Sequence, residues 1–581
     1  MVKAFKKTAV IMFALSIAAL FSVITSIGAG NLDYAESAPG GSVSNIDELI
    51  AAFGVDNFGN PNASVMQEET GEIRLRNSVI LQSPIIIKEG SYRLVGGGCT
   101  IARGFEEGSL IVLDGSNGQT PSLELERNYG SEYGESDEAN IILDGNSEDF
   151  PVADGSLISV NGGARLTLNS RVLFRNAVSS VSGGALSINS IESSGKVFSP
   201  EVNIFACRIN NCRAYDGGAI YFDGTVSGEG GKLTIEKSFF TDCSAENDGG
   251  AIYTVGGRIV LTDVEMSANS AKRGGGAYIC SEAELSNMSM NENTASISGG
   301  GLFCGKDSDS GKICEMSIIS IMALDNHSEG VGGMLTNEGI LVVNGFYSDG
   351  NSASGDGGSV YNTGSFAYTD GSMVNGESGG RGGAVYSASS GIFVMSGGEI
   401  NSNTALFGGA VYSEGYFEMS GGAVGNNRGG TPEVIVKGET VMSGSAVVSN
   451  KNVIGLCIYT DQSGNEVVPV IKLTGELTNK AEQRVAFYRE TDSGYKLANA
   501  AGMAVFQGDD AFIASAVKVF KVEGSFFRSY GIEADGSLFY KFPLMPVWAW
   551  LLTLLGVGAA TTAVVLLVKK RRGRATEKSV D

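Results

Sequence analysis

The chain has 581 residues, of which 83 are glycine and 10 are proline, and its formal net charge is −23. The hydrophobic content of 43% argues against wholesale disorder, and the glycines lack the Gly-X-Y period of collagen. The acidic balance excludes the basic footprint of a nucleic-acid-binding protein, and the single histidine, His327, excludes metal sites built from several histidines.

Residues 1–30 are predicted to be a secretory signal peptide. Three lysines precede an uncharged stretch at residues 8–27, and the small residues 28–30 follow it. A basic region, an apolar region and a small-residue cleavage site in this order are typical of exported proteins. An uncleaved membrane anchor is the alternative, because the apolar stretch is long for a signal.

After a linker at residues 31–44, residues 45–70 are predicted to form an N-terminal cap. Residues 45–53 are the one convincing helix before the C-terminal span, with Asn45 as the N-cap and with Asp47 and Glu48 in the first turn. We expect this helix to cover the open edge of the domain that follows, since an uncovered edge invites aggregation.

Residues 71–456 are predicted to form one repeat domain. A pentapeptide recurs in which two glycines precede a small, an aliphatic and an aromatic residue, and copies begin at Gly249, Gly274 and Gly299. Asparagine or cysteine stands five or six residues before most copies. These positions are Cys212, Cys243, Asn269, Asn293, Asn326, Asn351 and Asn403.

This repeat predicts an all-β chain. Short apolar runs bounded by glycine and polar residues read as strands, and helical periodicity is missing. Strands that recur about every 25 residues without helices fit a parallel β-helix solenoid, whose coils stack about 4.8 Å apart. The paired glycines would supply the positive φ of tight corners, and the asparagines would stack as a ladder of side-chain amides.

The C-terminal part differs. In residues 457–541 the glycine pairs stop, and a small β module is expected there as a cap. Residues 547–568 carry no charge, begin with both tryptophans of the chain, and are long enough to cross a bilayer as a single transmembrane helix. The basic tail at residues 569–581 would then be cytoplasmic and the ectodomain extracellular. A core helix is the alternative, and the basic stop argues against it.

The ectodomain, residues 31–541, holds 32 basic and 62 acidic residues, a net charge of −30. Such a surface repels anionic polymers and favours cationic partners or divalent ions. The other interpretation is that the charge keeps a long repeat domain soluble. Acidic loops such as Asp307 to Asp309 are candidates for calcium, but they lack the ordered spacing of an EF-hand loop, so solvated loops are preferred and no cofactor is expected.

The paired glycines with an upstream asparagine resemble the right-handed, pectin lyase-like parallel β-helix repeats of bacterial surface proteins. The motif is similar to the repeats of chlamydial polymorphic outer-membrane proteins, and the segment from Met395 to Thr404 is similar to adhesin-like proteins of gut Firmicutes. The resemblance implies a right-handed parallel β-helix, cell-surface display and, more weakly, adhesion.

Pectate lyases and polygalacturonases share this fold, so a membrane-tethered polysaccharide lyase or glycoside hydrolase is the alternative. Polygalacturonases need clustered aspartates and a His-Gly pair. Here the one Asp-Asp pair, Asp509 and Asp510, lies outside the repeat, and His327 is followed by Ser328. We therefore expect a non-catalytic protein that is adhesin-like or structural.

An aromatic stripe is the candidate binding surface for a glycan or a partner protein. If position four of the pentapeptide faces the core, position five faces outward. Ser187 and Thr336 interrupt the stripe. The alternative, which we prefer, is a purely structural ladder of stacked rings. The stripe consists of Tyr221, Tyr253, Tyr278, Phe303, Tyr361, Tyr386 and Tyr412.

The eight cysteines contain no CxxC pair. An oxidising exterior would allow a bridge among Cys207, Cys212 and Cys243, or between Cys280 and Cys304, but their even number does not give the connectivity.

Overall fold

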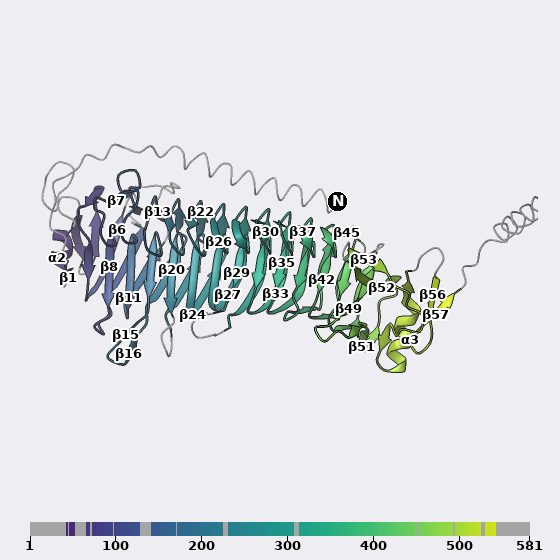
Figure 1. Ribbon diagram of the computed structural model, residues 1–581. Helices are drawn as coiled ribbons and strands as arrows, with labels where there is room; N and C mark the ends of the chain where they lie inside the picture. Colours follow the sequence, from purple (N-terminus) through teal and green to yellow (C-terminus); the bar gives the residue numbers. More distant parts are fainter. Residues whose placement is uncertain are drawn as a thin grey trace, which may run out of the picture. The chain divides into compact units, whose positions relative to one another are not determined.

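The computed structural model describes residues 42–43, 46–52, 65–69, 72–96, 98–127, 141–169, 171–224, 230–306, 313–430, 432–449, 452–491, 494–523 and 529–541. Most of these residues lie in strands that form long parallel sheets (Figure 1). The prediction of an all-β chain is confirmed, and the architecture is consistent with a β-helix solenoid. The described residues up to Val342, with Phe346–Ser352, form one compact unit; those from Ala353, with Val343–Gly345, form a second.

In the first unit each strand pairs in parallel with the strand at the same place in the next repeat, and one such circuit of the chain is called a coil below. Three long rows of strands result. The first row is β5 (Ile85–Ile87), β8 (Ile111–Gly115), β11 (Ile158–Gly162), β14 (Leu186–Asn189), β20 (Ile220–Gly224), β24 (Ile252–Thr262), β27 (Ala277–Asn291), β29 (Leu302–Cys304) and β32 (Leu335–Asn337).

The other two rows share some of the long strands with the first. The second row is β3 (Glu72–Leu75), β6 (Ser91–Gly96), β9 (Ser122–Arg127), β12 (Arg165–Asn169), β17 (Glu201–Phe205), β21 (Lys232–Glu236), β24, β27 and β30 (Glu315–Leu324). The third row is β4 (Val79–Leu81), β7 (Cys99–Arg103), β10 (Ile141–Asp144), β13 (Val172–Arg175), β18 (Arg208–Asn210), β22 (Phe239–Thr241), β25 (Glu265–Ser267) and β27.

Shorter strands complete the first unit. A corner row consists of β19 (Arg213–Ala214), β23 (Ser244–Ala245), β26 (Ser270–Arg273), β28 (Thr294–Ser298) and β31 (His327–Ser328). An antiparallel hairpin leaves the first row after β14 and consists of β15 (Ile191–Ser193) and β16 (Lys196–Phe198). Two strands precede the rows: β1 (Ser42–Val43) pairs with β5, and β2 (Val65–Glu69) pairs with β3.

Alternating burial along the strands builds the interior. In β21, Leu233 and Ile235 are fully buried, whereas Lys232 and Glu236 are exposed. The strands pair in register, so aliphatic side chains of neighbouring coils stack on one another, as Leu233 does on Ile259. Position four of the pentapeptide follows this rule, because Ile220, Ile252 and Leu302 are completely buried. The prediction that position four faces the core is confirmed.

Residues with left-handed backbone conformations form the corners of the coils. The first glycine of the pentapeptide takes a positive φ, which is 67° at Gly249, as the sequence predicted. Each residue of a second left-handed set directly precedes a ladder position, and all but one of these residues carry a side chain. In the first unit these residues are Asn211 (φ 48°), Asp242 (54°), Ala268 (55°), Glu292 (56°), Asp325 (54°) and Gly350 (70°).

The predicted asparagine ladder is present. Asn269, Asn293, Asn326 and Asn351 are fully buried, one per coil. The side-chain Nδ2 of each of the first three donates to the Oδ1 of the next at 2.9 Å. The same Oδ1 atoms also accept the backbone N–H of the preceding asparagine, as Asn326 Oδ1 does from Asn293 at 3.0 Å. Cys212 and Cys243 occupy the two positions before Asn269, and both thiols are buried.

The second unit repeats this scheme. Its first row is β35 (Val360–Asn362), β38 (Val385–Ser387), β42 (Val411–Ser413), β46 (Val434–Val436), β49 (Ile454–Thr460), β52 (Gln483–Thr491) and β55 (Phe520–Val522). Its second row is β36 (Ser365–Val374), β39 (Ile392–Met395), β43 (Tyr416–Met419), β47 (Thr440–Gly444), β51 (Ile471–Leu477) and β54 (Phe506–Gln507). Its third row is β36, β40 (Glu399–Asn401), β44 (Ala423–Gly425) and β48 (Val447–Ser449).

The ladder of the second unit is longer than the sequence suggested. Asn403 is followed by Asn427 and Asn452, which are joined by the same pair of hydrogen bonds per coil. Parallel pairing also continues past residue 456, since Ile454 pairs with Val485 and Gln483 pairs with Phe520. The corner row of this unit is β37 (Glu377–Arg381), β41 (Thr404–Phe407) and β45 (Arg428–Gly430).

Residues 457–541 contain a helix that the sequence analysis did not predict. Helix α3 (Asp510–Val519) packs on β51 and buries Ile513 and Ala516. Its apolar residues are spread around the helix and only Ile513 and Ala516 are buried, so no single apolar face marks the helix in the sequence. The remaining strands of this segment form antiparallel pairs. They are β50 (Glu466–Val467) with β49, β53 (Gly494–Leu497) with β52, and β56 (Ser529–Ile532) with β57 (Leu538–Lys541).

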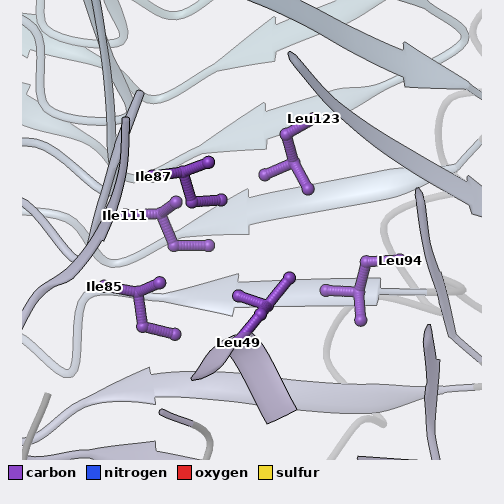
Figure 2. A pocket seen from close by; sticks show the side chains of 6 residues that line it. All are labelled: Leu49, Ile85, Ile87, Leu94, Ile111 and Leu123. Atoms are coloured by element: carbon purple, nitrogen blue, oxygen red, sulfur yellow. The ribbon is translucent and has the colours of Figure 1, made fainter. Parts of the chain in front are cut away.

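Helix α2 (Ile46–Ala52) lies beside the first coils and closes their apolar interior (Figure 1). Leu49 is 3% exposed and points toward a small cavity lined by aliphatic side chains from β5, β6, β8 and β9 (Figure 2). Those side chains are Ile85, Ile87, Leu94, Ile111 and Leu123. The helix and its acidic first turn therefore stand where the sequence placed them, whereas Asn45 lies outside the described residues.

Replacement of Leu49 by alanine is expected to weaken the docking of α2. The side chain fills the end of the interior, so its truncation should cost about 2 kcal/mol, at the low end for a buried leucine because a short helix can detach by itself. Hydrogen exchange of the α2 amides would measure the loss. The exposed Ala51→Ser change should leave exchange nearly unaltered, and equal protection in both variants would contradict this packing.

The predicted membrane topology depends on residues that the structure does not describe. The signal segment at residues 1–30, the span at residues 547–568 and the tail at residues 569–581 lie outside the described residues. In the part of the chain that the structure describes, no helix is long and apolar enough to cross a bilayer.

Candidate functional site

The aromatic stripe forms a stacked column in the first unit. Tyr221, Tyr253, Tyr278 and Phe303 are in-register partners on β20, β24, β27 and β29. Their ring centroids are 5.4, 5.1 and 4.8 Å apart, with interplanar angles of 2°, 17° and 7°. Ser187 and Thr336 pair with the two end rings and end the column, as the sequence predicted.

The second unit holds a shorter column. The centroids of Tyr361 and Tyr386 are 5.1 Å apart, and those of Tyr386 and Tyr412 are 5.7 Å apart. The hydroxyl of Tyr412 lies 2.6 Å from that of Tyr495 on β53. Tyr412 also packs on Ile435, which is its in-register partner in β46.

Burial divides the seven rings into two groups. Tyr278, Phe303, Tyr386 and Tyr412 are at most 6% exposed. These four rings fit the preferred interpretation, in which the stacked rings are a purely structural ladder. Tyr221, Tyr253 and Tyr361 are only half-buried. Binding of a ligand by the stripe stays a prediction, and it now concerns these three rings.

Arginine side chains cover the buried rings. The Arg273 guanidinium lies 5.0 Å from the Tyr278 ring centroid and 5.4 Å from that of Phe303. Two hydrogen bonds to the buried Asp248 carboxylate, at 2.9 and 2.5 Å, hold it there and raise the pKa of Arg273. In the second unit Arg381 covers the Tyr412 ring at 5.1 Å. A ligand therefore has no access to the column at these coils.

At the N-terminal end of the first column, called its open end below, the Tyr221 ring is half-buried, whereas Tyr278 and Phe303 are buried. One face of the Tyr221 ring stacks on Tyr253, and on its other side the in-register residue of the preceding coil is Ser187. A serine carries no ring, so the second face of Tyr221 has no aromatic partner from that coil. Stacking on one aromatic face is a common way to hold a planar or weakly polar ring.

A polar row flanks this open end. Two residues further along the first-row strands, Asp114, Asn161, Asn189 and Asp223 are in-register partners on four successive coils, and all four are half-buried. Asn189 Nδ2 donates to Asn161 Oδ1 at 3.0 Å and to Ser187 Oγ at 3.1 Å. The row thus presents carboxylate and amide groups beside the Tyr221 ring. In the two following coils the row continues with Val255 and Cys280, which pack against the covered part of the column.

Sequence reasoning missed the polar row, although a signal for it exists. Asn189 and Asp223 stand two residues after the fifth pentapeptide position, and strand side chains alternate. They therefore share the outward face with Ser187 and Tyr221. The earlier members, Asp114 and Asn161, precede the clean pentapeptides, so only the strand register assigns them to the same row.

The environment of Tyr221 is apolar and negative. Burial, together with the smaller effect of the Asp223 and Asp216 charges, raises the pKa of its phenol to about 12. The folded protein thus favours the neutral phenol of Tyr221. The resulting stabilisation is complete below the unfolded pKa of about 10, and it is lost as the pH rises through the pKa of Tyr221 in the folded state.

A Tyr221→Phe variant should therefore lose less stability between about pH 10 and 12 than the unchanged protein does. Denaturant titrations at both ends of this range would measure the free energy of unfolding. Parallel losses in the two proteins would contradict the assigned environment of Tyr221.

Two further features of the sequence concern metal binding and the single histidine. Within the described ranges, no three side chains of histidine, cysteine, aspartate or glutamate gather in a group that could hold a metal ion. The calcium candidate at Asp307 to Asp309 lies outside those ranges. His327 is a corner residue whose Nδ1 lies 2.9 Å from Ser352 Oγ.

Comparison with known proteins adds no family assignment. No family model, curated protein or solved structure was found to match the chain.

Proposed function

We propose that the chain is a membrane-anchored, non-catalytic bacterial surface protein that binds a glycan at the open end of its first aromatic column. The signal-like segment at residues 1–30, the apolar segment at residues 547–568 and the basic tail support an extracellular placement of the repeat. Connections between parallel strands are right-handed in nearly all proteins, so the coils are proposed to wind as a right-handed β-helix.

The observation that carries the binding proposal is the half-buried Tyr221 ring, which has Ser187 on one side and Asn189 and Asp223 nearby. A sugar presents an apolar ring face and a rim of hydroxyl groups. The phenol ring would stack on that face, while amide and carboxylate oxygens would accept hydrogen bonds from the hydroxyls. These carboxylates would repel uronic acids, so the proposed ligand is a neutral glycan.

The test is binding of the full chain in detergent to an array of neutral and acidic glycans. We expect selective binding of neutral glycans, at least about tenfold weaker for Tyr221→Ala because one stacking contact is worth about 0.5–1.5 kcal/mol plus its buried area. Tyr221→Phe should retain binding. The control is Tyr386→Ala, which removes a buried ring and should lower stability without changing affinity.

Other outcomes would overturn the proposal. Equal binding by Tyr221→Ala would place the ligand elsewhere, and a preference for uronic acids would contradict the assigned electrostatics. Loss of the bound glycan over time would favour the lyase or hydrolase alternative. Labelling of intact cells with a membrane-impermeant amine reagent tests the extracellular placement separately, and absence of label from the repeat would refute it.

A further inference from the structure

The amide ladder of the first unit starts with two thiols. In this part of the chain Asn210 pairs with Thr241 and Arg213 pairs with Ser244 in register, so Cys212 stands opposite Cys243. The backbone N–H of Ser244 donates to the Cys212 carbonyl at 2.9 Å, which shows that the two coils are in direct contact at this corner. Neighbouring parallel strands are about 4.8 Å apart, within the Cα separation of about 4.4–6.8 Å that disulfides require.

The two thiols are poorly satisfied as hydrogen-bonding groups. Cys212 and Cys243 are 1% and 0% exposed, and their side chains lie within reach of each other. Cys212 Sγ contacts the Asn210 carbonyl at 3.3 Å, and Cys243 Sγ contacts the Thr241 and Ile209 carbonyls at 3.5 and 3.8 Å. Thiols are weak donors and acceptors, so this step of the ladder lacks the strong amide bonds that join the later coils.

We propose that Cys212 and Cys243 form a disulfide bond in the exported protein. This bond covalently links two neighbouring coils where the ladder begins. This inference rests on the proposed extracellular placement of the repeat. Thiol–disulfide exchange with an oxidised dithiol protein or with glutathione disulfide supplies the oxidation. One cysteine thiolate attacks the oxidant's disulfide, and the second thiolate then displaces the oxidant's sulfur. The oxidant's S–S bond breaks as the cysteine S–S bond forms, and the two protons and two electrons of the cysteine thiols pass to the oxidant's sulfurs, which leave as thiols.

The bond would form before the coils close. Burial raises the pKa of the Cys212 thiol well above its usual value, so the attacking thiolate is scarce once the chain has folded. Cys207 lies in the same coil as Cys212 and is equally buried, but its in-register partner is Ser238, whose Oγ accepts the Cys207 N–H at 3.1 Å. Cys207 therefore has no thiol opposite and serves as the matched control.

The test maps the thiols of the full chain recovered from the cell envelope. Free thiols are alkylated in denaturant, and the peptides are then identified with and without reduction. We expect one linked peptide pair that contains Cys212 and Cys243. The pair should vanish in Cys212→Ser and persist in Cys207→Ser. Protein that the impermeant amine reagent labels is exported. If both Cys212 and Cys243 of that protein are alkylated before reduction, their thiols are free and the proposal is overturned.

A second arm separates this inference from the proposed location. The denatured, reduced full chain is refolded in detergent with a glutathione redox buffer. The same linked pair in most molecules would support the geometry even for a chain that proves not to be exported. Refolded protein that keeps both thiols, or that links Cys207 instead, would refute the geometry whatever the location.

Discussion

The Asn326→Ala variant is expected to lose about 3–5 kcal/mol of stability, the largest effect of any single change predicted for this chain. The Oδ1 of Asn326 accepts two hydrogen bonds from Asn293, and its Nδ2 donates to Asn351 Oδ1 and to the Met290 carbonyl. Alanine would leave both Asn293 donors and the Met290 carbonyl without these partners inside the interior. Each buried polar group that loses its partner costs about 1–3 kcal/mol.

Denaturant unfolding and hydrogen exchange of the neighbouring coils would measure this loss. Asn291→Ala is the control, because that half-buried side chain bonds only locally, to Ser289 Oγ at 2.9 Å. Its change should cost less than about 1 kcal/mol. Similar losses for the two variants would show that the ladder contributes no more than one local hydrogen bond of a half-buried side chain.

A Gly250→Ala change should destabilise the first unit by about 3 kcal/mol or more. Gly250 is the second glycine of its pentapeptide, and an added Cβ would lie 2.0 Å from the Gly275 carbonyl oxygen and 2.7 Å from the backbone of Ser270. Both obstacles are main chain of the next coil, so no side chain can rotate away. The coils would have to separate, which lengthens the hydrogen bond from Gly250 N–H to the Gly274 carbonyl.

Gly195→Ala separates this steric effect from the general cost of replacing a glycine. Gly195 in the β15–β16 hairpin has a φ of 71°, and an added Cβ would meet nothing within 4 Å. Its change should cost only the left-handed penalty of about 1–2 kcal/mol. Thermal unfolding of the two variants would compare them, and equal losses would contradict a close approach of coils at Gly250.

Much of the fold was predictable because each repeat carries the same local pattern of residues. Alternating apolar residues, paired glycines and a recurrent asparagine indicated parallel coils, and the structure confirms the coil register through the ladder from Asn269 to Asn351. The corner residues that precede the ladder were not predictable. Ala268 and Glu292 take left-handed conformations that their side chains disfavour, because hydrogen bonding between coils at the corner outweighs the local preference.

The candidate site was predictable only in part. The sequence identified all seven rings and both ends of the first column, because they recur at a fixed position. It did not separate the covered rings from the accessible ones. That distinction depends on Arg273, which reaches over Tyr278 and Phe303 from the preceding corner, and on Asp248, which holds it there.

The repeat, its β character and the residues that stack follow from the amino-acid sequence, because stacked positions recur with similar residue types at a nearly constant spacing. Only the folded coils show which stacked positions remain accessible and that Cys207 has no thiol opposite, whereas the recurrent ladder position already assigned Cys212 and Cys243 to neighbouring coils. Those properties depend on the register between coils and on the side chains that neighbouring coils contribute. Insertions of different length separate the coils in the sequence, so Cys212 and Cys243 meet across 31 positions, whereas Asn269 and Asn293 meet across 24.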